Sequence, residues 1–223
     1  TLELPPECVS LILRAAGPRR TLTLQRVSKG WLSAARDPSL YATLDYLPLS
    51  VTMAPLVALL GQPKFCHVSR LTLHHKHKLG STGAEKLGKA APRLEHIDAR
   101  SDHKLHLSDD DVLSLAAHVP SLTSLAVDMW NFSRHGVRRL AAAMGRRLIH
   151  LDLEYDTITK HYLDDGALEA LATSCPELRS LEIYGSTYTY EPALDGVTGR
   201  SVIRLLGLDA KWDGGRAQSS QGW

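Results

Sequence analysis

The stretch SCPELRSLEIYG, residues 174–185, contains the pattern that decides the fold. Its apolar residues follow the spacing apolar-x-x-apolar-x-apolar, in Leu178, Leu181 and Ile183. A repeat architecture is missed unless such a pattern is sought along the whole chain. The search finds four more copies, with first residues 26, 28, 26 and 30 positions apart. These copies are Val68/Leu71/Leu73, Leu94/Ile97/Ala99, Leu122/Leu125/Val127 and Leu148/Leu151/Leu153.

A second pattern lies between these copies, and it predicts helices. It consists of an apolar residue, two variable residues, and Leu followed by a small or apolar residue. Residues i and i+3 share a helix face, and Ser108 and Ser133 stand where they can cap helix N-termini. The six copies are Val57/Leu60/Gly61, Ala84/Leu87/Gly88, Val112/Leu115/Ala116, Val137/Leu140/Ala141, Leu168/Leu171/Ala172 and Val202/Leu205/Leu206.

Each unit is therefore a short strand followed by a helix, too small to bury its apolar face without stacking on its neighbours. The period and the motif resemble those of leucine-rich repeats. Residues 175–178 and 136–141 are similar to the cysteine-containing subclass, although Ala91 and Val119 replace the Cys in other copies. We expect an α/β solenoid with about five strand and six helix half-repeats.

Composition and charge limit the classes of function that the sequence supports. The chain has 223 residues, is 43% apolar and carries a net charge of +2, so it can form a continuous core but has no general nucleic-acid footprint. The charged residues are unevenly distributed along the chain. Residues 51–100 contain eight Lys and Arg against three Asp and Glu, whereas residues 151–200 contain three against ten.

The cysteines and the hydropathy pattern bear on the compartment. Cys8, Cys66 and Cys175 are odd in number and far apart, which is no disulfide framework and favours a reducing compartment. No leader-like or membrane-spanning apolar run is recognised. We expect a cytoplasmic or nuclear protein with neither a membrane nor a nucleic acid as partner.

The first 45 residues do not follow the repeat. Their first predicted helix carries Val9, Ile12 and Leu13 at helical spacing, and Gly17-Pro18 ends it. A segment this short buries little apolar area, so its apolar stripe is expected to pack on a partner or a neighbouring domain. The predicted helices are Pro6 to Ala16, about Leu22 to Val27, and Trp31 to Arg36.

This segment resembles the F-box, at the right distance ahead of a repeat array. The matching stretches are Leu4-Pro5-Pro6-Glu7, Ile12-Leu13, Leu24-Gln25-Arg26-Val27, Val27-Ser28-Lys29-Gly30-Trp31 and Asp37-Pro38-Ser39-Leu40-Tyr41. Ala16 stands where the family usually has a hydrophobic residue before the break, and Thr21 and Tyr41 stand where Leu and Trp are commoner. Together with the repeats, the chain is similar to F-box/leucine-rich-repeat proteins.

The resemblance implies a non-catalytic substrate-recognition subunit of an SCF-type (Skp1-cullin-F-box) E3 ubiquitin ligase. The F-box helices would dock on a Skp1-like adaptor and through it on a cullin, and the repeats would hold a target protein for ubiquitination. The implied adaptor-binding residues are Leu4, Pro5, Val9, Ile12, Leu13, Leu24, Val27 and Trp31. Some of them can equally form the core of the small domain itself.

A target-binding site is expected on the concave face, to which the residues between the apolar strand positions point. This face turns acidic toward the C-terminal end, where five of the seven tyrosines also lie. We predict that a basic segment of a target docks there, although a merely solvated face is the plainer reading. The predicted target-binding residues are Asp128, Asp152, Glu154, Glu182, Tyr184 and Tyr188.

The sequence favours neither a metal site nor a cofactor. His74, His75 and His77 lie together, but no Cys or carboxylate follows at a recognisable ligand spacing. His96 and His150 each share a strand face with an Asp, yet no Ser or Cys nucleophile and no phosphate-binding glycine motif accompanies them. They are read as a hydrogen-bonded ladder.

The domain boundaries follow from these patterns. We expect an F-box over 1–45, a linker over 46–56, repeats over 57–208, and a polar, disordered tail over 209–223. One alternative function is a scaffold without a ligase role, in which the F-box-like segment caps the solenoid. A hormone-sensor function of the plant receptor kind fits less well, because five strands form only a shallow arc.

Overall fold

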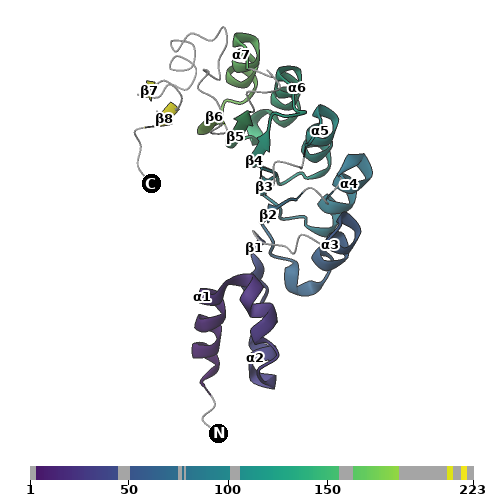
Figure 1. Ribbon diagram of the computed structural model, residues 1–223, viewed down its shortest axis with the longest axis vertical. Coiled ribbons are helices and arrows are strands. Elements are labelled where there is room, and N and C mark those ends of the chain that lie inside the picture. Colours follow the sequence, from purple (N-terminus) through teal and green to yellow (C-terminus); the bar gives the residue numbers. More distant parts are fainter. Residues whose placement is uncertain are drawn as a thin grey trace.

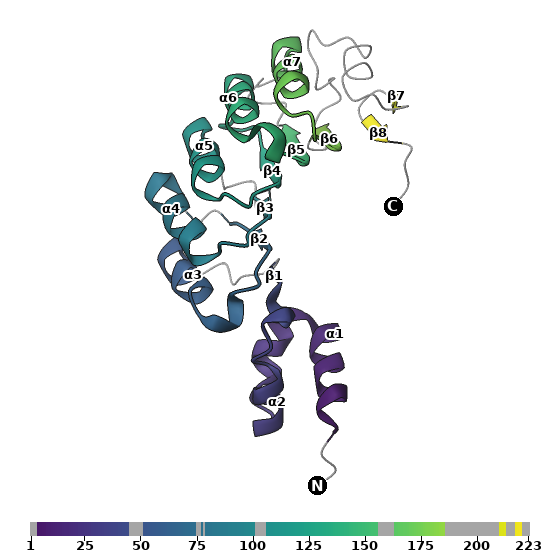
Figure 2. The same ribbon diagram turned by 180° about the vertical axis from the view of Figure 1, so that it is seen from behind.

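The computed structural model describes residues 4–44, 51–74, 77, 79–100, 106–155, 163–185, 210–212 and 217–219. The chain forms a curved arc, in which short strands line the inner side and helices the outer side (Figure 1). A pair of helical arms extends from the N-terminal end of the arc, as the reverse view also shows (Figure 2). The architecture is thus mixed α/β, with a parallel sheet and an N-terminal helical domain.

The N-terminal domain contains α1 (Pro6–Leu24), α2 (Lys29–Ala34) and the 3-10 turn η1 (Pro38–Tyr41). Helix α1 is kinked at Gly17, where φ is +72°, so it consists of two helical pieces. This confirms that Gly17 interrupts the first predicted helix, since glycine adopts positive φ at little cost. The second piece ends at Leu24, earlier than the predicted Val27, because Val27 lies in the turn before the Ser28 N-cap of α2.

Six parallel strands form one sheet in chain order, one strand more than the repeat spacing predicts. The register aligns the central apolar position of every repeat, so that Leu44, Leu71, Ile97, Leu125, Leu151 and Leu181 stand side by side. The strands are β1 (Thr43–Leu44), β2 (Arg70–Thr72), β3 (His96–Asp98), β4 (Ser124–Asp128), β5 (His150–Tyr155) and β6 (Ser180–Gly185).

The helices lie on the outer side of the sheet (Figure 1). Five of the six predicted helix motifs fall in these helices and turn their motif Leu into the core; the motif at Val202 lies outside the described residues. The helices are α3 (Met53–Leu60), α4 (Gly80–Ala90), α5 (Asp109–His118), α6 (Arg134–Met144) and α7 (Asp165–Ser174), with 3-10 turns η2 (Pro63–Phe65) and η3 (Gly145–Arg147).

One hydrogen-bond motif joins every pair of neighbouring repeats. A backbone carbonyl just before each strand accepts the N–H groups of two consecutive residues of the next repeat, at 2.7–3.2 Å. Because the same bonds recur at each step, the repeats stack with a constant offset, as a solenoid requires. The accepting carbonyls belong to Ala42, Ser69, Glu95, Thr123 and Ile149.

The position that Cys175 occupies in the repeat motif is buried. Cys175 is 3% exposed, and its Sγ donates to the Ala141 carbonyl of the preceding repeat at 3.6 Å. Burial raises the pKa of this thiol to about 11, so it is protonated and unreactive at neutral pH. Ala91 and Val119 are buried at the same position, which explains why small and apolar residues replace Cys there.

The two ends of the solenoid differ from the boundaries drawn on the sequence. Strand β1 lies within the segment assigned to the F-box, and α3 begins within the predicted linker. Within the tail, which is predicted to be disordered from its polar composition, the structure describes β7 (Ala210–Trp212) and β8 (Ala217–Ser219); they form an antiparallel pair, and β8 contacts β6.

A substitution at Gly88 tests how closely neighbouring repeats pack. A Cβ atom at this position of α4 would lie 1.9 Å from the His118 carbonyl oxygen in the next repeat. We predict that Gly88→Ala lowers the free energy of unfolding by about 1–3 kcal/mol, measured by urea denaturation. Gly30→Ala is the control, because the nearest contact of its Cβ is 3.7 Å away. A Gly88→Ala chain as stable as wild type would contradict the packing.

Candidate protein-interaction surfaces

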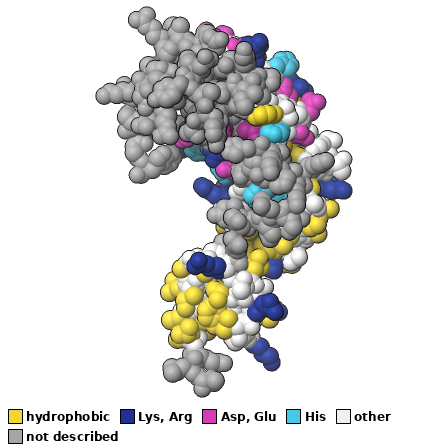
Figure 3. Space-filling view, viewed as in Figure 1, with side chains coloured by type: hydrophobic (Ala, Val, Ile, Leu, Met, Phe, Trp, Pro, Cys, Tyr) yellow, Lys and Arg dark blue, Asp and Glu magenta, His cyan; other side chains and the backbone are white. Residues whose placement is uncertain are grey.

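Helix α1 has apolar residues on two faces. Val9 and Leu13, four residues apart, are 4% and 0% exposed and pack into the core. On the side of the helix away from them Leu11 is 67% exposed, and on the flank Ile12 is 40% exposed. Figure 3 shows a patch of hydrophobic side chains over the N-terminal helical domain, with Lys and Arg side chains beside it. A helix whose outer face is apolar is typical of an interaction surface.

The structure separates the eight predicted adaptor-binding residues by exposure. Three apolar side chains among them are exposed, namely Leu4, Ile12 and Val27, and Pro5 is exposed as well. Leu24 and Trp31 are partly buried against the core, and Val9 and Leu13 lie inside it. Val9 and Leu13 therefore hold the small domain together, and the other residues remain available to a partner.

Sequence reasoning missed three exposed leucines. Leu11, Leu22 and Leu32 are 67%, 36% and 40% exposed. Leu11 lies in the run Leu11-Ile12-Leu13, of which only Leu13 can point inward on one helical turn. Counting outward-facing leucines in each helix of the segment is the signal that would have found them.

Two departures from the F-box pattern have structural roles here. The Thr21 hydroxyl is buried and donates to the carbonyls of Leu13 and Gly17, at 3.1 and 2.9 Å, across the kink of α1. The Tyr41 hydroxyl donates to the Ala35 carbonyl at 2.7 Å, and the ring packs edge-on against Phe65 at 4.9 Å. Tyr41 thereby links the helical domain to the first repeat.

The concave face presents its side chains in rows that cross the strands. One row contains Arg70, His96, Ser124, His150 and Ser180, and the next contains Thr72, Asp98, Ala126, Asp152 and Glu182. In the first row His96 Nδ1 lies 2.6 Å from Ser124 Oγ. The ladder expected from the sequence joins histidines to carboxylates, whereas His96 pairs here with the hydroxyl of Ser124.

Arg100 organises the acidic row. Its guanidinium donates two hydrogen bonds to Asp98, at 3.0 and 2.8 Å, and its Nη1 lies 3.4 Å from Asp152 two strands away. Ala126 stands between the two carboxylates in the row and, being small, leaves space for this span. Strand alternation predicts Arg100 on the concave face, but spacing alone did not reveal its bridge between Asp98 and Asp152.

The two carboxylates that Arg100 joins have opposite pKa shifts. Burial raises the pKa of Asp98, but the hydrogen bonds and charge of Arg100 outweigh it, and the pKa lies below the usual value. Burial and the neighbouring Glu182 raise the pKa of Asp152, which Arg100 offsets only in part. Arg100 therefore stabilises the charged form of Asp98 more than that of Asp152.

The predicted target-binding residues are partly brought together. Asp128 and Glu154 are paired in register on β4 and β5, and Asp152 and Glu182 on β5 and β6. Asp128 accepts the Trp130 N–H at 3.1 Å and lies 3.9 Å from His106, which stacks on Trp130. Glu182 is exposed. The backbone of Tyr184 belongs to β6, and Tyr188 lies outside the described residues.

Among the described residues, no group of three or more His, Cys, Asp or Glu side chains is arranged to hold a metal ion. His74 and His77 are buried, and His77 Nδ1 accepts the His74 N–H at 2.8 Å; His75 lies outside the described part. None of the described helices has the length and apolar character needed to cross a bilayer.

Comparison with known proteins supports the N-terminal assignment. A family model described as F-box-like matches residues 1–46, so this segment is an F-box-like domain. No curated protein matches the sequence.

Two solved structures are similar to the chain. A chain in the crystal structure of the Rad7 and Elc1 complex in yeast is 19% identical, with a TM-score of 0.50, over 90% of this chain and 44% of that one. The leucine-rich repeat-containing protein LegL7 from Legionella pneumophila is 14% identical, with a TM-score of 0.37, over 82% and 79% of the two chains. At 19% identity the first likeness shows the fold, and this chain spans less than half of that neighbour.

The opposite shifts of Asp98 and Asp152 give a pH-dependent prediction. The pKa of Asp98 is lower in the folded chain than its ordinary value of 3.8, so the charged carboxyl stabilises the fold at pH values above 3.8. This stabilisation is lost as pH falls through the folded pKa. Asp98→Asn should therefore lower the free energy of unfolding by about 1–2 kcal/mol at pH 7, with a smaller loss at pH ~3. A raised pKa reverses the sign, so Asp152→Asn should stabilise the chain at pH 7 and not at pH ~3.

Urea denaturation of both variants at the two pH values tests the pair. Each variant is the control for the other, since both replace a carboxylate of one Arg100 bridge. Equal losses of stability at pH 7 in the two variants would show that Arg100 does not stabilise the charge of Asp98 more than that of Asp152.

Proposed function

We propose that the chain is the substrate-recognition subunit of an SCF-type E3 ubiquitin ligase. In this function the F-box-like domain docks on a Skp1-family adaptor, which connects it to a cullin, and the repeats bind the target. The chain itself is non-catalytic, and ubiquitin transfer belongs to other subunits. The observation that carries the proposal is the exposed apolar face of the F-box-like domain, centred on Leu11 and Ile12.

Energetics favour a protein partner for this face. Burying one leucine or isoleucine side chain is worth about 1.5–3 kcal/mol, and Leu4, Leu11, Ile12, Val27 and Leu32 are all at least 40% exposed. Several such side chains together supply enough for a specific interface. A chain of similar fold occurs in the structure of the Rad7 and Elc1 complex, which supports assembly with a second protein.

The adaptor-binding test uses Ile12→Asp/Val27→Asp. Both side chains are exposed, so the fold should persist, while two carboxylates in an apolar interface should weaken adaptor binding about a hundredfold or more. Binding is measured by co-expression with a Skp1-family adaptor, size-exclusion chromatography and calorimetry. Leu13 is unsuited to this test, because Asp at a fully buried position would unfold the domain.

Ala142→Asp/Ala172→Asp is the matched control, since both alanines are exposed on the outer helices α6 and α7. The control should bind the adaptor as wild type does. A folded wild-type chain that elutes alone would instead favour the scaffold function, in which the F-box-like domain only caps the solenoid. That alternative rests on β1, through which the domain joins the sheet directly.

For the target we propose a basic segment that docks on Asp128, Asp152, Glu154 and Glu182, next to Tyr184 and Tyr188. The register pairing of Asp152 with the exposed Glu182, which raises the pKa of Asp152 after burial, supports this, because a cation placed there relieves their mutual repulsion. The docking direction follows the acidic row across β5 and β6.

A charge reversal tests the target site. Asp152→Lys/Glu182→Lys should reduce binding of Lys- and Arg-rich peptides at least tenfold, because attraction becomes repulsion, measured by fluorescence anisotropy on a peptide panel. Asp110→Lys/Glu169→Lys makes the same charge change on exposed residues of the outer helices α5 and α7 and should bind normally. Equal binding by both variants would remove the acidic row as the target site.

A further inference from the structure

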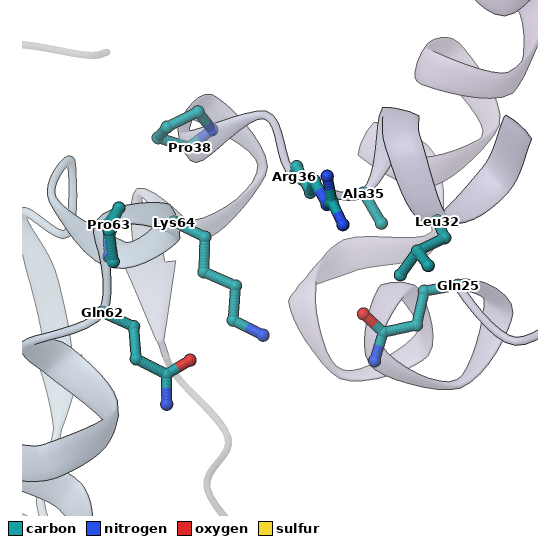
Figure 4. Close-up of a pocket in the computed structure, with 8 residues that line it drawn as sticks. All are labelled: Gln25, Leu32, Ala35, Arg36, Pro38, Gln62, Pro63 and Lys64. Atoms are coloured by element: carbon teal, nitrogen blue, oxygen red, sulfur yellow. The ribbon is translucent and has the colours of Figure 1, made fainter. Parts of the chain in front are cut away.

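A groove of about 420 Å³ lies where the F-box-like domain meets the first repeat. One wall comes from α2 and η1, with Leu32, Ala35 and Pro38, and the other from the start of η2, with Pro63. Figure 4 shows side chains from the two walls extending toward each other across the space. The groove therefore has apolar walls and belongs to both parts of the molecule.

The charged side chains in the groove are both cations. Arg36 comes from the F-box-like domain and Lys64 from the first repeat, and no acidic residue among the described ones lines the space. Within the described part of the chain, neither forms an ion pair. Asp37, the acid next in sequence to Arg36, accepts the Ser39 N–H at 2.9 Å and lies 3.8 Å from Arg14. The described lining of the groove is thus positively charged.

Both walls hold their side chains in position. The Lys64 ammonium lies 5.0 Å from the centre of the Phe65 ring and 5.9 Å from that of Tyr41, within the range of a cation–π interaction. On the other wall, Gln25 Nε2 donates to the Leu22 carbonyl at 2.9 Å. These contacts limit the freedom of the groove and so lower the entropy lost on binding.

One wall of the groove belongs to the F-box-like domain and includes an exposed apolar side chain. Leu32 of α2 lines the groove and is 40% exposed. Gln25, which also lines it, follows directly on α1 and stands between the exposed Leu22 and Val27 in the sequence. This wall is therefore part of the domain that is proposed to dock the adaptor.

We propose that the groove binds an acidic segment of the Skp1-family adaptor, with a carboxylate between Arg36 and Lys64 and apolar side chains against Leu32 and Pro63. This deepens the proposed function and rests on it. The adaptor then contacts the F-box-like domain and the first repeat together, which fixes the direction in which the concave face points relative to the ligase. Charge complementarity to Arg36 and Lys64 selects an acidic occupant, and the proposed docking of the adaptor on the F-box-like domain makes the adaptor that occupant.

The test is the double reversal Arg36→Glu/Lys64→Glu in the full chain, with adaptor affinity measured by calorimetry. We expect affinity to fall at least tenfold, and Arg36→Gln/Lys64→Gln to give an intermediate loss. Raising ionic strength from about 0.05 to 0.5 M should weaken wild-type binding and affect the reversed variant much less. Lys86→Glu/Arg93→Glu, which makes the same charge change at exposed residues in α4 and the turn after it, should bind within twofold of wild type.

The outcomes separate this proposal from the function beneath it. If Arg36→Glu/Lys64→Glu loses adaptor affinity while the control Lys86→Glu/Arg93→Glu binds normally, the groove is supported as an adaptor-binding site. If the wild-type chain and Arg36→Glu/Lys64→Glu bind the adaptor equally well, the groove proposal is wrong and the proposed adaptor docking is unaffected. A wild-type chain that does not bind the adaptor at all overturns both. Circular dichroism of each variant separates a loss of binding from unfolding, because Arg36, Lys86 and Arg93 are exposed whereas Lys64 is partly buried.

Discussion

The rest of the structure depends on the shared-carbonyl hydrogen bond between consecutive repeats. From Ala42 to Ile149, one carbonyl per repeat accepts two N–H groups of the next, and the apolar centres of all six strands stand in register as a result. No repeat can bury its own apolar face. The first of these carbonyls follows directly on η1 of the F-box-like domain, so the domain is the structural start of the solenoid.

This continuity gives the molecule two interaction surfaces of different character. The surface on the F-box-like domain is apolar and suits a permanent partner, whereas the concave surface is charged and is organised by Arg100 between Asp98 and Asp152. Apolar burial supplies affinity, and charge complementarity supplies selectivity and association rate. An SCF-type receptor needs both properties, a stable link to its ligase and a selective link to its target.

The repeat pattern predicts much of the fold because its apolar positions are fixed by burial. The five strand motifs and the register of Leu71, Ile97 and Leu125 follow from spacing alone. Strand β1 escapes this reasoning, since only Thr43 and Leu44 pair and they lie at the end of the segment assigned to the F-box, outside the copies of the repeat motif. Only its backbone hydrogen bonds identify it.

The candidate sites are less predictable than the fold. Sequence spacing places Val9, Ile12 and Leu13 on one stripe of α1, but the packing buries Val9 and Leu13 and leaves Ile12 exposed. Similarly, the acidic residues of the concave face can be located from alternation, yet the Arg100 bridge depends on reach across two strands. Such contacts between repeats depend on side-chain conformation, which carries no periodic signal.

The central claim is that adaptor docking uses the outer face of the F-box-like domain and leaves the concave face free. Hydrogen exchange of the chain, measured alone and with a Skp1-family adaptor, tests it most directly. The account predicts slower exchange on binding in α1, α2 and η2, with no change in β3 to β6. Slower exchange in the concave strands, or no change in α1, would contradict it.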